Sequence, residues 1–170
     1  NHDIGRDMGG FIDERVLVSE PNMMVWYRPR GRVTLNINGE DFTLPLPSLI
    51  FRLSRGKLSV VAYKGDKRPT QTTDVFQAPL PNVNEAGHWC SGGNTLPERP
   101  RQHHIERIEK TFFRSPFTHD HGSTIRFPEG EGQQLTEFLP TLQHKKARAF
   151  PNSRLVSARP DRLGDWIKRG

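Results

Sequence analysis

The sequence predicts an α+β protein in which antiparallel strands come first and helices follow. Short or alternating apolar runs fill residues 23–63, and apolar residues at helical spacing begin only at residue 101. Glycine and proline are abundant, with 15 and 14 residues among 170, and hydrophobic residues make up only 33% of the chain, which is typical of a loop-rich domain. The length allows one domain with its own core, or one domain with an appended tail.

The N-terminal half has the pattern of an antiparallel meander of about four strands. Residues 23–27 form a short apolar run that fits a buried strand. Apolar residues alternate over 33–37 and again over 42–46, with Asn38-Gly39 between them, which predicts a hairpin. Residues 57–63 predict a further strand, whereas residues 1–20 combine three glycines with many charges and are expected to be irregular.

Residues 68–100 are turn-rich and contain the one cysteine of the chain, Cys90. Apart from a short strand expected near 75–76, this stretch shows no periodicity, and so long an irregular segment inside a domain is usually functional. Helices are predicted after it, from Ile105, Ile108 and Phe112, from the apolar residues of 135–142 with an interruption near Pro140, and from those of 163–167.

The positive charge lies at the C-terminal end. Residues 143–170 hold eight lysines and arginines against two acids, which accounts for the whole net charge of +6. We therefore divide the chain into an irregular segment 1–20, a folded domain 21–142 and a basic extension 143–170. The extension would attract an acidic partner, but it has no interleaved aromatics or known motif, so nucleic acid is not the expected partner.

A lone cysteine forms no internal disulfide, which favours a reducing compartment, and we expect a cytoplasmic protein. The apolar runs are far shorter than the roughly 20 residues of a membrane-spanning helix, so no membrane association is expected. The chain starts at Asn1 with no leader pattern, which we interpret as a truncated N-terminus.

The sequence gives no sign of a cofactor or a metal. It lacks a phosphate-binding loop and a dinucleotide fingerprint. Its histidines, such as the adjacent His103 and His104, have no recognised zinc spacing, so no metal site is expected. A cysteine hydrolase would need Cys90 beside a histidine, and several histidines could meet that requirement.

The segment 80–90 reads Leu-Pro-Asn-Val-Asn-Glu-Ala-Gly-His-Trp-Cys and resembles the ubiquitin-conjugating (E2) family. In that family a His-Pro-Asn tripeptide follows the strands, and the active-site cysteine comes eight residues after its asparagine. Asn82 and Cys90 have this spacing, and Leu80 replaces the histidine. Segments 62–70, 76–83 and 112–119 are most similar to the bacterial E2-like group that includes PRTRC system protein B, prokaryotic E2 family D.

The resemblance implies the fold and the function of the chain. The fold would be that of a ubiquitin-conjugating enzyme, with a four-strand meander, a long cysteine-bearing loop and flanking helices. Cys90 would accept a ubiquitin-like protein as a thioester from an E1-like enzyme and pass it to an amine of a target protein. Asn82 would donate to the oxyanion or brace the loop, and Asp120 or His119 would accept a proton.

One feature leaves the function open. The first helix, which meets the E1 in E2 proteins, is not recognisable here. The alternatives to conjugation are a non-catalytic E2-like module of a plasmid or antiphage-defence operon, which would bind partners through its basic extension, and a cysteine hydrolase.

Overall fold

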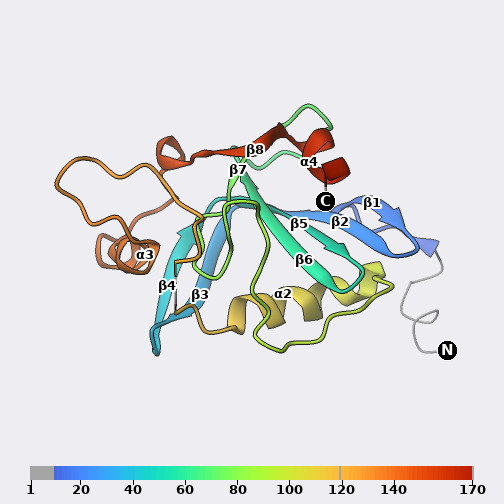
Figure 1. The fold of residues 1–170 in the computed structure, drawn as a ribbon, viewed down its shortest axis with the longest axis horizontal. Helices are drawn as coiled ribbons and strands as arrows, with labels where there is room; N and C mark the ends of the chain where they lie inside the picture. The colour runs from blue at the N-terminus through green and yellow to red at the C-terminus, as the bar shows by residue number, and fades with distance from the viewer. Residues whose placement is uncertain (1–9, 119, 170) are drawn as a thin grey trace.

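The structure is a computed structural model that describes residues 10–118 and 120–169. Within this part of the chain, six strands form an antiparallel sheet in the order β1-β2-β5-β6-β7-β8, and β3 and β4 form a separate hairpin (Figure 1). The strands are β1 (Val16–Glu20), β2 (Met23–Arg28), β3 (Gly31–Ile37), β4 (Glu40–Leu46), β5 (Ser48–Ser54), β6 (Lys57–Tyr63), β7 (Asp74–Gln77) and β8 (Ser157–Arg162). The helices are α2 (Ile105–Arg114), α3 (Leu135–His144) and α4 (Leu163–Arg169), with short 3-10 turns η2 (Gln102–His104) and η3 (Asn152–Arg154).

The six-stranded sheet is covered on both faces, by α2 on one and by α4 on the other (Figure 1). Because side chains alternate along a strand, Phe51 and Val60 join the core on the α2 face, while Ile50 and Val61 join the core on the α4 face. The ring of Phe112 on α2 packs edge-on against that of Phe51, with centroids 5.5 Å apart. The central strands are therefore buried on both sides.

The expected α+β class with antiparallel strands is confirmed, and so is the hairpin over 33–46. In that hairpin Asn38 and Gly39 both adopt the left-handed conformation that a tight two-residue turn requires. The predicted meander, however, is divided between two sheets. The strand β2 pairs with β5, and the β3–β4 hairpin projects from between them.

Three strands of the sheet, β1, β5 and β8, have no counterpart in the sequence-based prediction. Residues 16–20, expected to be irregular, form the edge strand β1. The strand β5 is buried along six of its seven residues, so it shows no alternation of apolar and polar side chains from which a strand could be recognised.

The C-terminal residues 143–170, expected as a basic extension, contribute to this architecture. Their strand β8 pairs with β7 at the edge of the sheet, and α4 buries Leu163 and Trp166.

None of the helices in the described part of the chain has the length and apolar character that a membrane crossing requires.

Candidate functional site

Cys90 stands at the end of a small hairpin formed by residues 82–90, which we call the cysteine hairpin. Val83 pairs with Trp89 across it. The Oδ1 atom of Asn84 accepts hydrogen bonds from the backbone N–H groups of Ala86, at 3.0 Å, and His88, at 2.9 Å, and thereby closes the turn. The irregular stretch of the sequence thus has a defined local structure around the cysteine.

The cysteine hairpin is fastened to the edge of β6. The N–H of Val60 donates to the carbonyl of Gly87 at 2.7 Å, and the N–H of Trp89 donates to the carbonyl of Leu58 at 3.1 Å. A Cβ atom on Gly87, whose φ is +95°, would lie 2.9 Å from the carbonyl oxygen of Val60, so this close approach requires glycine. The hairpin occupies the part of the β6 edge that β7 leaves unpaired.

Alternation within the hairpin turns Trp89 inward and leaves Cys90 exposed. The Trp89 ring packs against Phe112 of α2, with centroids 5.5 Å apart. Beyond Cys90 the chain turns through exposed glycines, and a Cβ on Gly92 or Gly93 would meet no atom within 4 Å. Cys90 is therefore an exposed, free cysteine followed by an open turn.

Asn82 lies beside Cys90, as the spacing of the two residues predicts. Its backbone carbonyl accepts a hydrogen bond from the N–H of Cys90 at 2.8 Å, and its own φ is +64°. Its side-chain Nδ2 donates to the carbonyl of Pro116 at 2.6 Å, and the residue is 9% exposed. Asn82 thereby ties the cysteine hairpin to the loop that follows α2.

That loop holds the two other expected site residues. Phe117 exchanges backbone hydrogen bonds with the β3–β4 hairpin at Asn36 and Asn38, over 2.8 and 3.1 Å. The carboxylate of Asp120 accepts from the backbone N–H groups of Leu135, at 2.9 Å, and Thr136, at 3.3 Å, and so caps the N-terminus of α3. His119 lies outside the described residues.

His88, two residues before the cysteine, faces the opposite direction from Trp89. Its Nδ1 lies 3.2 Å from the hydroxyl of Ser59 on the α4 face of the sheet.

Across residues 10–118 and 120–169, no group of three or more histidine, cysteine, aspartate or glutamate side chains is arranged to hold a metal ion.

The sequence reasoning missed a buried carboxylate that fixes α2. Glu109 is 5% exposed and accepts from Trp26 Nε1 at 2.9 Å and from Arg28 at 2.7 Å. A signal was present, because Glu109 follows Ile105 by four residues and so lies on the apolar face of the predicted helix. This network holds the helix against which Trp89 of the cysteine hairpin packs.

No curated protein and no solved structure matches this chain. A family model described as prokaryotic E2 family D matches residues 4–158, which include the cysteine hairpin, α2 and α3. The resemblance seen in residues 80–90 is thus confirmed over most of the sequence, and the chain belongs to prokaryotic E2 family D.

Proposed function

We propose that the protein is a conjugating enzyme that carries a ubiquitin-like protein as a thioester on Cys90. The observation that supports this most directly is the exposed, unpaired thiol of Cys90 at the end of a rigidly attached hairpin. A large acyl donor needs a thiol that it can reach from outside, whereas the position of that thiol must be fixed by the protein. Membership of an E2 family supports the same reaction class.

The proposed reaction has two steps. The Cys90 thiolate attacks the thioester that an E1-like enzyme forms with the C-terminal carboxyl group of the ubiquitin-like protein, and the E1 thiolate leaves. An amine of the target then attacks the new thioester, the bond between carbonyl carbon and Cys90 sulfur breaks, and an amide forms. The amine gives up a proton in this second step, so a nearby base would accelerate it.

Asn82 acts in this proposal as a positioning residue. Its hydrogen bond to Pro116 and its contact with the Cys90 backbone hold the cysteine hairpin against the loop after α2. Asp120 and His119 stay the candidates for the base. The Asp120 carboxylate also caps α3, so its replacement has a structural effect that the test must separate from a chemical one.

The experiment combines the chain with an E1-like enzyme, a ubiquitin-like protein and ATP, and detects the adduct by intact-mass spectrometry. We expect an adduct that thiol reductants remove, that Cys90→Ser converts to a reductant-resistant ester, and that Cys90→Ala abolishes. Ser91→Ala is the matched control and should load normally. An adduct that persists in Cys90→Ala would refute the proposal, as would cleavage of a ubiquitin-like fusion by the chain without ATP.

The same loaded protein tests the proposed base. Asp120→Asn keeps one side-chain oxygen for the shorter hydrogen bond, from the N–H of Leu135, but loses the oxygen that accepts from Thr136 and the negative charge. If Asp120 accepts the proton, we expect release of the ubiquitin-like protein to free lysine to slow by about 100-fold or more, while loading is unchanged. Normal release in this variant would assign Asp120 to the helix cap alone.

A further inference from the structure

The α4 face of the sheet buries an arginine beside its apolar cluster. Arg52 of β5 stands between Val25 of β2 and Ser59 of β6, and it is 8% exposed. Within residues 10–118 and 120–169, no hydrogen bond or ion pair to its side chain is found, and its Nε atom is fully buried without a partner. A buried guanidinium N–H without an acceptor is costly and calls for a specific reason.

The environment of Arg52 affects its ionisation in the expected direction. Burial lowers the pKa of Arg52, and the negative charge of Glu20 on β1 partly opposes this effect. An arginine keeps its proton at any physiological pH, so the residue remains charged in this apolar setting. A bound anion would supply the missing partner.

Arg52 lines a pocket of about 300 Å³ between the sheet, the cysteine hairpin and α4. The polar and aromatic residues that form it are Arg52, Ser59, His88, Arg159, Trp166 and Arg169. Three of them are arginines and none is acidic. The two exposed arginines come from β8 and α4, and Arg169 donates to the carbonyl of Arg159 at 2.6 Å, which connects the two elements.

We propose that this pocket binds the phosphate group of a small molecule. Guanidinium groups present paired N–H donors that match the oxygens of a phosphate, and three of them together suit a dianion better than a single carboxylate. The volume lies at the lower end of the range of small-molecule sites, which is about 300–1,000 Å³. Arg52 is 8% exposed, so it suits a small ligand that enters the pocket better than a flat protein surface.

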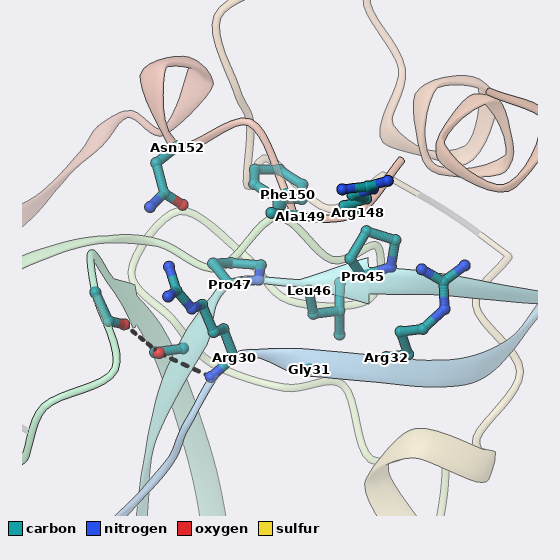
Figure 2. Close-up of a pocket in the computed structure, with 12 residues that line it drawn as sticks. Arg30, Gly31, Arg32, Pro45, Leu46, Pro47, Arg148, Ala149, Phe150 and Asn152 are labelled. Atoms are coloured by element: carbon teal, nitrogen blue, oxygen red, sulfur yellow. Dashed lines mark hydrogen bonds between the residues drawn. The ribbon is translucent and has the colours of Figure 1, made fainter. Parts of the chain in front are cut away.

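A second arginine-lined pocket, of about 380 Å³, differs in that none of its arginines is buried. Figure 2 shows Arg30 and Arg32 on one side of Pro45 and Pro47, and Arg148 on the other. All three arginines are exposed, Arg32 donates to the carbonyl of Ala147 at 3.0 Å, and Arg30 lies 3.7 Å from Asp66. Their charges are solvated or paired without a ligand, so this pocket serves as the control.

The cysteine hairpin also lines the pocket at Arg52, through Ala86 and His88. His88 lines it two residues before Cys90, and a Cβ on Gly87 would lie 3.4 Å from the Trp166 ring. A ligand held there would contact the hairpin and α4 together and would restrain both. This binding does not depend on thioester formation, so the inference goes beyond the proposed conjugation and is testable in its absence.

The experiment measures binding of inorganic phosphate and of a nucleoside monophosphate to the full chain by calorimetry, at constant ionic strength. We expect both to bind and chloride and succinate not to. Arg52→Met and Arg159→Gln should each weaken binding at least tenfold, and Arg148→Gln, with the same change of charge at the control pocket, should leave it within twofold.

Three results would overturn the inference. One is the absence of phosphate binding in the unaltered chain. Another is succinate binding as tightly as phosphate, which would make the pocket a carboxylate site for an acidic partner. The third is an equal loss of affinity in Arg148→Gln and Arg52→Met, because the effect would then reflect net charge alone. Arg159 is exposed, so its variant tests the pocket even if Arg52→Met fails to fold.

Discussion

In the described part of the chain, each face of the six-stranded sheet buries one charged side chain. This side chain has hydrogen-bond partners on one face and none on the other. On the α2 face, Glu109 accepts hydrogen bonds from Trp26 and Arg28, and Arg15 lies 3.7 Å from it. On the α4 face, Arg52 is nearly as buried, and the described part of the chain offers its side chain no hydrogen bond or ion pair. The first charge is paired within the protein, whereas the second is the basis of the phosphate site proposed above.

The largest effect on stability is expected from breaking the paired charge. Glu109→Ala would leave the indole N–H of Trp26 buried without an acceptor and Arg28 without its carboxylate. We expect the free energy of unfolding to fall by about 3 kcal/mol, at the lower end of the range for a broken buried pair because Arg28 stays partly solvated. Urea denaturation measures this loss.

A matched control lies on the same helix. Glu106 forms an exposed pair with Lys110, over 3.2 Å, one turn along α2. Glu106→Ala should cost no more than about 0.5 kcal/mol. Equal losses of unfolding free energy in the two variants would show that the buried pairing of Glu109 stabilises the fold no more than an exposed pair does. The comparison between the two faces would then fail.

A smaller effect is expected from Tyr63, which shares the α4 face with Arg52. Its hydroxyl is buried, and burial raises its pKa to about 12, with Ser48 partly opposing the shift. In the unfolded chain the phenol ionises near pH 10, so above that pH only the folded state keeps the proton. Stability is therefore complete below pH 10 and should fall by about 2 kcal/mol as the pH rises toward 12.

Tyr63→Phe isolates this contribution, because lysines that titrate in the same range are common to both proteins. The difference in unfolding free energy between the two should be constant up to pH 10, and above it the unaltered chain should lose up to about 2 kcal/mol relative to Tyr63→Phe. A difference independent of pH from 9 to 11.5 would mean that the hydroxyl reaches solvent or a partner in the folded state.

Much of this architecture follows from local patterns in the sequence. The β3–β4 hairpin and α2 follow from period-2 and helical spacing, both of which are properties of one segment. The strand β5 could not be recognised, because burial on both faces removes its alternation, and β8 depends on pairing with the distant β7. Pairing between β2 and β5 is likewise a long-range property that no local pattern carries.

The candidate site likewise combines one proximity that could be predicted with contacts that only the folded chain forms. The resemblance to E2 proteins predicts that Asn82 and Cys90 lie together, and the structure joins them through a short hairpin that was not predicted. The contact of Asn82 with Pro116 and the capping of α3 by Asp120 join segments that only the folded chain brings together. Arg52 gave no signal, because one charged residue in an apolar strand does not reveal whether a counter-charge faces it.

The smallest expected effect is the one that separates the two faces most clearly. Arg52→Met replaces an unpartnered buried charge with an apolar chain of similar length, so in phosphate-free buffer the free energy of unfolding should be unchanged or should rise by about 1 kcal/mol. Added phosphate should then raise the melting temperature of the unaltered chain but not that of the variant. A loss of stability as large as that of Glu109→Ala, measured without phosphate, would mean that Arg52 has a partner within the protein and that both buried charges are structural.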